Sequence, residues 1–369
     1  MKQSQRFPRL QRAATLAPLA VNHLIGEAAD ALYVHSGKRI DATRPRRIYG
    51  LLNERCNLKC LGCQYWRLPA YAQLMSADQW MGVLAELRDF LGRYHINFSG
   101  GEPLLRRDLF EILNYCRDNG IHAGLTTNGV LLKERQAREL VDARLFSLNV
   151  SIDGAQAATH DEQRGVVGSF DKAVGAIRLM RAYAHSIGVN TPIIIKPMVS
   201  ALNLAEMPTL VELAADLGCS ILFQPVSDWG TPETDRLWVK DLKRLGQIVD
   251  ALIGLRQAGH PVMNSAEQMR DWTRHFQRAP RVPDSSSVKC TVGLDTLIIM
   301  ANGELRHCYK KDALGKVGSA AIQDIWRSEG AREIRTESLA CTRGCTESCT
   351  VKRPISQLAR GVIHLIRST

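Results

Sequence analysis

The feature that most constrains the fold is a regular alternation of short apolar segments with longer helical ones between residues 47 and 227. The short runs are rich in β-branched residues, and the segments between them repeat apolar residues at helical spacing. Strands and helices that alternate in this way form a parallel sheet with helices outside it. The predicted strands cover 47–54, 95–100, 121–127, 145–152, 191–199 and 220–227.

Helical spacing predicts helices over 76–93, 107–118, 131–141, 170–186, 204–217, 234–258 and 320–329. Ser76, with Gln79 three residues later, has the pattern of a capping box at the start of the first helix. Prolines and serines after residue 258 predict a linker, and the cysteine-rich part after it predicts a small, separately organised module. The predicted organisation is a basic helical extension (1–46), a barrel (47–258), a linker (259–289), a cysteine-rich domain (290–350) and a basic amphipathic helix (351–369).

The chain of 369 residues has no run close to the roughly 18 apolar residues of a membrane span, and its first 20 residues lack a secretory signal. We therefore expect a cytoplasmic location. Ten cysteines in such a chain favour metal binding or catalysis over disulfides. Cys116 and Cys219 stand alone in apolar surroundings, and we interpret them as small core residues.

The positive charge is concentrated at the two ends of the chain. Residues 1–47 hold nine basic and three acidic residues, and residues 351–369 hold four basic and no acidic ones, so the ends carry +10 of the net +11. The nearly neutral body does not predict a nucleic-acid-binding surface. The two ends either cap the open barrel or contact an anionic membrane as basic amphipathic helices, which would associate the protein with the membrane from the cytoplasm.

Three cysteines, Cys56, Cys60 and Cys63, follow the first predicted strand. They therefore lie at the carboxyl edge of the sheet, where parallel α/β folds place their active sites. A structural zinc site needs four ligands, commonly two close pairs. Three thiolates instead suit a [4Fe-4S] cluster with one iron open to a small ligand.

The C-x3-C-x2-C triplet resembles the signature of the radical S-adenosylmethionine (radical SAM) superfamily, and further motifs follow it in the family's order: "SGGEP" (99–103), "TTNG" (126–129) and "SIDG" (151–154). The resemblance implies that Cys56, Cys60 and Cys63 hold a [4Fe-4S] cluster that binds SAM. It implies cofactor contacts by Gly100, Gly101, Glu102, Asn128, Ser151 and Arg164, with Glu102 on the methionine amino group and Arg164 on its carboxylate.

One position departs from the family pattern. The family usually has an aromatic residue just before the third cysteine, beside the adenine, and this chain has Gly62 there. Tyr65 or Trp66 can take over this contact.

The second cysteine group resembles the auxiliary-cluster domain of many radical SAM enzymes, known as SPASM or in a shorter form as twitch. Its members are Cys290, Cys308, Cys341, Cys345 and Cys349. The family's full form has about seven cysteines for two clusters, so five imply one auxiliary [4Fe-4S] cluster with one cysteine left over. A zinc knot is the alternative, because four thiolates also satisfy zinc.

The resemblance implies a partial (β/α)6 TIM-like barrel with a small C-terminal α+β SPASM or twitch module. It implies an oxidoreductase or transferase-type enzyme that reductively cleaves SAM and abstracts hydrogen with a 5'-deoxyadenosyl radical. We expect a small or lipid-linked metabolite as substrate, a ferredoxin or flavodoxin as reductant, and dehydrogenation, epimerisation or C–C bond formation as the outcome. The alternative is a maturase of a ribosomally synthesised peptide. A protein for electron transfer or metal storage would have no use for the glycine-rich motifs.

Overall fold

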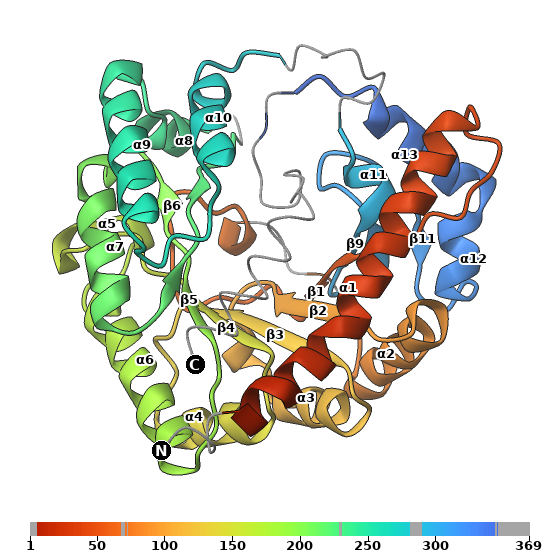
Figure 1. The fold of residues 1–369 in the computed structure, drawn as a ribbon, viewed down its shortest axis with the longest axis horizontal. Helices are drawn as coiled ribbons and strands as arrows, with labels where there is room; N and C mark the ends of the chain where they lie inside the picture. The colour runs from red at the N-terminus through yellow and green to blue at the C-terminus, as the bar shows by residue number, and fades with distance from the viewer. Residues whose placement is uncertain are drawn as a thin grey trace.

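The computed structural model describes residues 6–67, 71, 73–228, 231–280, 290–343 and 345, and for residues 6–16 it describes the backbone alone. Within these residues, no helix is long and apolar enough to cross a bilayer. A strongly curved sheet occupies the middle of the molecule, and helices line its outer side (Figure 1).

The central sheet has nine strands in the order β11-β10-β9-β1-β2-β3-β4-β5-β7, and β6 and β8 form a second small sheet. All pairings from β9 to β7 are parallel, whereas β10 and β11 run antiparallel. The strands are β1 (Arg47–Leu51), β2 (His95–Ser99), β3 (His122–Thr127), β4 (Ser147–Val150), β5 (Ile193–Ile195), β6 (Met198–Val199), β7 (Ser220–Ile221), β8 (Gln224–Pro225), β9 (Thr296–Ile299), β10 (Glu304–Arg306) and β11 (Gly315–Lys316).

All six predicted barrel strands are present, but the last two are each divided. The run 191–199 becomes β5 and β6, and 220–227 becomes β7 and β8. Pro197 lies between β5 and β6 and has no N–H to continue the ladder. Its carbonyl still accepts a hydrogen bond from the Gln224 N–H at 3.0 Å, so the two sheets remain connected.

The barrel helices occur where the sequence predicts them, and Ser76 and Gln79 form the predicted capping box. The predicted helix over 234–258 is divided into α8 and α9, and helices α5, α10, α11 and α13 had no predicted counterpart. The helices are α1 (Arg6–His35), α2 (Ala77–Leu91), α3 (Leu109–Asp118), α4 (Glu134–Asp142), α5 (Ala157–Arg164), α6 (Ser169–Ser186), α7 (Met207–Asp216), α8 (Pro232–Leu237), α9 (Leu242–Gln257), α10 (Ala266–Phe276), α11 (Val292–Asp295), α12 (Ile322–Arg327) and α13 (Glu329–Leu339), with short 3-10 turns η1 (Tyr65–Arg67), η2 (Pro103–Leu105) and η3 (Leu204–Glu206).

The predicted linker over 259–289 is wrong in its first half, where α10 packs on α9. Ser265 caps this helix in a capping box with Gln268, and Met269, Trp272 and Phe276 form its buried face. This i, i+3, i+7 spacing gives a helix an apolar face that it can bury. Residues 281–289 lie outside the described part of the chain.

The C-terminal module continues the barrel sheet, contrary to the expectation of a separately organised unit. Its first strand, β9, pairs in parallel with β1, with Arg47 opposite Thr296 and Gly50 opposite Ile299. The residues of β9 are all buried, as expected for a strand covered on both faces. The second cysteine group is thereby joined to the strand that leads into the first.

The two faces of the barrel strands differ sharply in polarity. Side chains that point outward to the helices are apolar and fully buried, including Phe98, Leu125 and Leu148. The register places Asn97, Thr126 and Asn149 on the opposite, inner face. Because the interior of a packed TIM barrel is usually filled by branched apolar residues, this polar inner face indicates a place for a ligand.

Candidate active site

The first cysteine group lies on the loop that follows β1, and Arg106 holds both ends of this loop. Its Nη1 donates to the Leu52 carbonyl at 2.8 Å, and its Nη2 donates to the Met75 carbonyl at 2.9 Å. The Asp108 carboxylate pairs with the same guanidinium, with 2.6 Å between Nε and Oδ1. The loop is therefore fixed at both ends by a single partly buried side chain, which sequence reasoning did not identify.

Two glycines after β2 let the cysteine loop lie directly against the strand end. The Gly101 N–H donates to the Asn53 carbonyl and the Glu102 N–H to the Arg55 carbonyl, both at 2.8 Å. A Cβ on Gly101 would lie 2.1 Å from the Arg55 oxygen, and one on Gly100 would lie 2.4 Å from the Asn53 oxygen. No larger residue fits either position. The structure thus gives both predicted glycines a packing role.

The Glu102 carboxylate is buried at the centre of the motif residues. Its Oε1 accepts hydrogen bonds from Thr127 Oγ1 at 2.7 Å and the Leu104 N–H at 3.1 Å, and its Oε2 accepts one from the Asn128 N–H at 2.8 Å. Burial raises the pKa of Glu102, and these hydrogen bonds oppose that shift. Since a carboxylate oxygen has two acceptor positions, Oε2 keeps one for the predicted ammonium group.

Asn128 and Ser151 follow the neighbouring strands β3 and β4 and come to the same edge as the cysteine loop. Asn128 Nδ2 donates to Asn57 Oδ1 at 2.9 Å and lies 4.0 Å from Cys56 Sγ. The Ser151 N–H donates to the Thr127 carbonyl at 3.0 Å. The carboxyl ends of adjacent parallel strands therefore gather these residues, as the sequence predicts. Their contact with a cofactor stays a prediction.

Arg164, the last residue of α5, points toward the thiols. Its Nη1 lies 3.8 Å from Cys60 Sγ, and its Nε lies 2.7 Å from the buried Asp153 carboxylate. Burial by itself lowers the pKa of Arg164. The negative charges of Asp153 and then Cys60 raise it by more, so the pKa lies above its ordinary value and the guanidinium stays charged. Sequence reasoning missed Asp153, although it belongs to the quoted "SIDG" segment. A buried carboxylate aimed at Arg164 fixes the group predicted to meet the methionine carboxylate.

The three thiols of the loop share one environment. Burial raises the pKa of Cys56, and it raises that of Cys60 to about 11; Arg164 opposes the shift and Cys63 adds to it in both cases. Among the described residues, no three His, Cys, Asp or Glu side chains are close enough together to hold a metal ion. The donor set nevertheless fits an iron–sulfur cluster, because a neighbouring cation favours the thiolate form that iron requires. Ligation by these three residues stays a prediction.

The position before the third cysteine is covered by a methionine side chain. A Cβ on Gly62 would lie 2.6 Å from Met198 Cε. Of the two aromatic candidates, Trp66 is tied to the cysteine loop through a 3.0 Å hydrogen bond from its Nε1 to the Cys60 carbonyl. Tyr65 packs instead in a cluster around Ile298.

The second cysteine group is partly assembled in the described residues. Cys290 is buried beside Val292, and Cys308, Cys341 and Tyr49 pack against this pair. Three of the five predicted ligands therefore share one apolar cluster, although they are not close enough together to hold a metal ion. Cys345 is half-buried and Cys349 lies outside the described residues, and ligation of a cluster by all five cysteines stays a prediction.

The two remaining cysteines are core residues, as predicted. Cys116 on α3 is 0% exposed and Cys219 is 3% exposed, and both belong to the main apolar core. Burial raises the pKa of each to about 12, which keeps both thiols protonated and unreactive.

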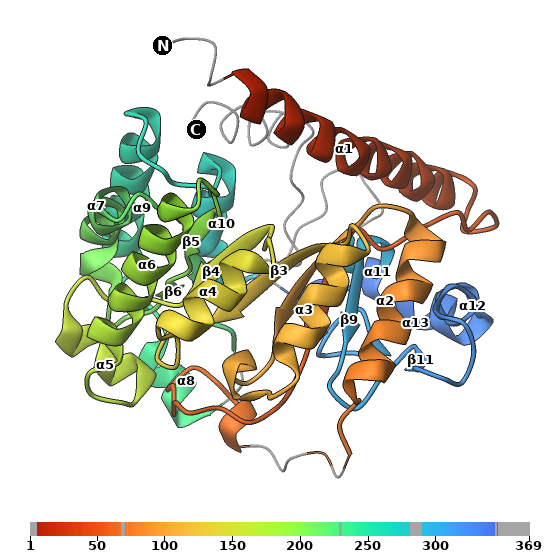
Figure 2. The same ribbon diagram turned by 90° about the horizontal axis from the view of Figure 1, so that it is seen from below.

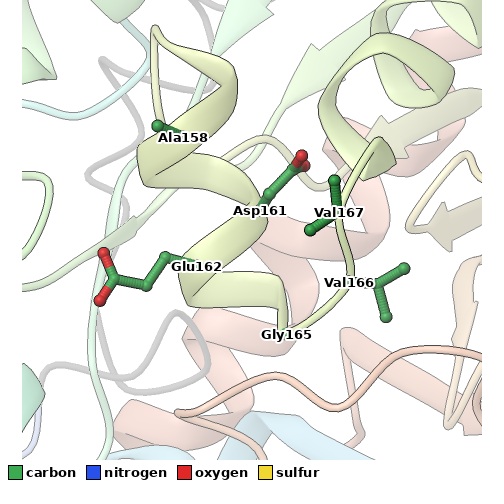
Figure 3. A pocket seen from close by; sticks show the side chains of 6 residues that line it. All are labelled: Ala158, Asp161, Glu162, Gly165, Val166 and Val167. Carbon is green, nitrogen blue, oxygen red and sulfur yellow. The ribbon is translucent and has the colours of Figure 1, made fainter.

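A shallow surface hollow of about 440 Å³ lies beside α5, lined by Ala158, Asp161, Glu162, Gly165, Val166 and Val167 (Figure 3). Its two carboxylates already have partners. Asp161 accepts from the Gly168 N–H and from Ser169 Oγ at the start of α6, and Glu162 pairs with Arg236. Both carboxylates of this hollow are therefore already paired and offer no free charge to a ligand. Arg164, in contrast, faces the thiols of the cysteine loop.

Neutral His160 supports the Asp153 backbone, and this predicts a pH-dependent stability. His160 is 1% exposed, and its Nδ1 accepts a hydrogen bond from the Asp153 N–H at 3.1 Å. Burial, and then Arg164, lowers the pKa of His160 to about 4. Between pH 6.5 and 4 the unfolded chain therefore binds a proton that the folded chain does not. We expect this residue to remove about 2 kcal/mol of unfolding free energy between pH 7.5 and pH 5.

Chemical denaturation at both pH values, without oxygen, measures this effect. His160→Gln should show a smaller loss than the wild type by about that amount. The exposed His35 provides the matched control, and His35→Gln should retain the wild-type loss. Equal losses in wild type and His160→Gln would show that the buried histidine is not the group that titrates.

The family comparisons agree with this geometry. The model of the radical SAM superfamily matches residues 51–200, and that of an iron-sulfur cluster-binding domain, SPASM, matches residues 290–350. The first range contains the cysteine loop, and the second contains the second cysteine group.

Curated relatives extend the match. An AdoMet-dependent heme synthase of Methanosarcina barkeri is 37% identical over 175 residues, which is 47% of this chain and 48% of the relative, so the match spans about half the relative's length. A PqqA peptide cyclase of Rhodopseudomonas palustris is 25% identical over 296 residues, 76% of this chain and 73% of the relative.

Solved structures share the fold. SuiB of Streptococcus suis bound to S-adenosylmethionine has a TM-score of 0.64 at 17% identity, over 80% of this chain and 68% of that one. The protein anSMEcpe with bound AdoMet has a TM-score of 0.62 at 17% identity, over 88% of this chain and 96% of that one. At this identity they support the fold class alone, and they confirm the predicted partial barrel with its C-terminal module.

The cofactors predicted from the sequence follow from the two domain matches. They are a SAM-binding [4Fe-4S] cluster, S-adenosylmethionine and an auxiliary cluster in the C-terminal domain. Both family matches agree with the cysteine loop and with the motifs at the ends of successive strands. The chain belongs to the radical SAM superfamily and carries a SPASM domain.

Proposed function

We propose that this radical SAM enzyme modifies a peptide, by abstracting a hydrogen atom from one of its carbons after reductive cleavage of SAM. The observation that carries the proposal is the polar inner face of the barrel, which offers amide and hydroxyl groups of the kind that pair with peptide groups. When bound, the cluster and SAM supply the 5'-deoxyadenosyl radical, and the protein residues position the substrate and exclude water.

Three side chains on adjacent strands build this polar face. Asn149 Nδ2 donates to Asn97 Oδ1 at 2.8 Å and to Thr126 Oγ1 at 3.1 Å, and Asn97 Nδ2 donates to Thr126 Oγ1 at 3.0 Å. The Thr126 oxygen thus accepts from both amides, so its own O–H points elsewhere. Since Thr126 precedes Asn128 by two residues on the same face, this network lies one layer beneath the cofactor edge.

Tyrosines line the region between the two cysteine groups. Tyr49, Tyr65, Tyr71 and Tyr309 pack around the buried Leu51, Ile298 and Met300, and Tyr49 also contacts the Cys290 group. Tyrosine presents a broad apolar ring together with a hydroxyl, and for this reason it is enriched where proteins recognise peptides and other proteins. An interior of amides and tyrosines therefore suits a peptide better than a lipid chain.

The relatives support the same alternative. A PqqA peptide cyclase aligns over 76% of this chain. The sequence analysis put a small or lipid-linked metabolite first, but its motifs describe the cofactor and carry no information about the substrate. The reductant belongs to the proposal as well: we expect a ferredoxin or flavodoxin to supply the electron.

A second candidate is a tetrapyrrole substrate. It rests on the heme synthase of Methanosarcina barkeri, whose 37% identity is limited to 175 residues. The polar Asn97, Thr126 and Asn149 argue against a large apolar ring system in the barrel interior, and we rank it second.

Deuterium transfer provides the test. The enzyme, with both clusters reconstituted without oxygen, is incubated with SAM, a reductant and peptides encoded by short reading frames beside the gene, made with deuterated residues. We expect deuterium in 5'-deoxyadenosine and a matching mass change in the peptide. Deuterated iron-coproporphyrin III serves as the competing substrate.

Asn149→Leu separates substrate binding from SAM cleavage, because it removes the amide but keeps the size of the side chain. We expect it to retain 5'-deoxyadenosine formation without substrate and to lose peptide modification by at least about tenfold. Deuterium transfer from the porphyrin alone would replace the peptide proposal with the second candidate.

A further inference from the structure

Over residues 17–35, whose side chains the structure describes, helix α1 contacts the barrel along one face. Asn22 Nδ2 donates to the carbonyls of Leu91 at 3.2 Å and Arg93 at 2.7 Å, where α2 ends. Ala29 and Tyr33 are buried against the protein on the same side. Figure 2 shows α1 along the top of the view, whereas the cysteine loop lies at the opposite end of the barrel. The helix therefore covers the end of the barrel away from the thiols.

A second face of α1 is apolar and uncovered in the described structure. Val21 is 52% exposed, Leu24 47%, Ile25 46% and Leu32 44%, and Ala17 and Ala28 are exposed between them. Residues 17, 21, 24 and 28 alternate spacings of four and three, which is the seam that one helix presents to another. We name Ala17, Val21, Leu24, Ile25, Ala28 and Leu32 the α1 stripe. Such a long exposed apolar stripe indicates a binding surface.

The chain contains a segment that matches this stripe. We propose that residues 355–366, which lie outside the described residues, pack as a helix against the α1 stripe. Their sequence repeats Ile355, Leu358, Val362 and Ile366 at helical spacing. Its large side chains are complementary in size to the alanines of the stripe, as required for knobs that enter holes.

The path of the chain permits this contact. Tyr33, near the end of α1, packs with Leu339 at the end of α13, and its hydroxyl lies 3.0 Å from Thr336 Oγ1. From Cys345 to Ile355 the chain can span about 33–36 Å. The stripe from Leu32 to Ala17 is only about 22 Å long. The C-terminal segment can therefore reach every part of it.

The charges of the two segments favour the C-terminal segment over a membrane as the partner of the α1 stripe. Residues 17–35 of α1 contain Glu27 and Asp30 and no lysine or arginine, whereas residues 351–369 contain four basic residues and no acid. Asp30 pairs with Arg46 at 2.6 Å in the buried layer below α1, and Glu27 lies 3.3 Å from His23 on the same helix. Residues 17–35 thus offer no lysine or arginine to anionic lipid, and their acidic side chains complement a basic helix.

Photo-crosslinking of the full-length, cluster-loaded protein tests the contact. Benzoylphenylalanine replaces Leu24 in one protein and Val167, an 89% exposed side chain on the barrel side, in the control. We expect the Leu24 probe to crosslink within one chain to residues 355–366, and the Val167 probe to leave them untouched. A dimer-sized product would assign the stripe to a second copy, and crosslinks only to added anionic vesicles would assign it to a membrane. Either result, or none, overturns the proposal.

Hydrogen exchange gives an independent readout that does not depend on the substrate. In the wild type, the amides of 355–366 should exchange at least about tenfold more slowly than in a Leu24→Asp, Ala28→Asp variant, because buried carboxylates break the apolar contact. Val362→Asp should have the same effect from the other side, and Val167→Asp should have none. Both stripe positions are exposed, so β2 and β3 should keep their protection. Equal exchange in wild type and variant contradicts the proposal.

Discussion

A variant with Cys56, Cys60 and Cys63 all replaced by alanine should hold about four irons per chain in place of about eight and should form no 5'-deoxyadenosine. The three thiols lie on one loop, with Arg164 3.8 Å from Cys60 and Asn128 4.0 Å from Cys56. These three thiolates are the only predicted iron ligands on the cysteine loop. Without them the SAM-binding cluster is lost, and cleavage of SAM stops. Iron analysis and chromatography of 5'-deoxyadenosine measure both effects after reconstitution without oxygen.

The matched control is Cys116→Ala, because Cys116 is fully buried on α3. It should keep all of its iron and its rate of SAM cleavage. Replacing Cys290, Cys308 and Cys341 by alanine should remove the roughly four irons of the auxiliary cluster and leave the SAM-binding cluster in place. A variant without Cys56, Cys60 and Cys63 that still cleaves SAM would show that the cysteine loop is not the cofactor site. About four irons with zinc in the wild type would identify the C-terminal module as a zinc knot.

Local patterns in the sequence were sufficient for most of the barrel. The spacing of apolar residues predicted every barrel strand, and Ser76 with Gln79 predicted a helix start that the structure confirms. The cysteine loop and the motif residues up to Ser151 could be placed together because each follows a strand, and parallel strands end at one edge. These signals are short-range, so one sequence contains them completely.

The residues that fix the site geometry could not be found in this way. Arg106 reaches carbonyls 54 and 31 positions away, and Asp153 is recognisable as a partner only once α5 brings Arg164 to it. The pairing of β9 with β1 joins residues about 250 positions apart. The prolines and serines that follow α10 indicate a linker, whereas the spacing of Met269, Trp272 and Phe276 indicates the helix that the structure has. Contacts between distant residues leave no periodic signal in a single sequence.

Replacing Gly101 by alanine should disable the site as fully as loss of a thiol, although Gly101 need touch neither iron nor substrate. Its new Cβ would lie 2.1 Å from the Arg55 carbonyl oxygen, which is backbone and cannot rotate away. The hydrogen bonds from Gly101 to Asn53 and from Glu102 to Arg55 would have to break, and Cys56 follows Arg55 directly. We expect a loss of about 2–3 kcal/mol in unfolding free energy and at least about a hundredfold slower SAM cleavage.

Gly82→Ala is the matched control for this substitution. Gly82 lies in an exposed part of α2, and a Cβ added there would have no atom within 4 Å, so alanine should stabilise the helix by about 0.5–1 kcal/mol and leave cleavage unchanged. The same added methyl group thus has opposite effects at two glycines, because one faces solvent and the other faces the loop of Cys56. Normal iron content and activity in Gly101→Ala would mean that the cysteine loop does not lie against this strand end in the working enzyme.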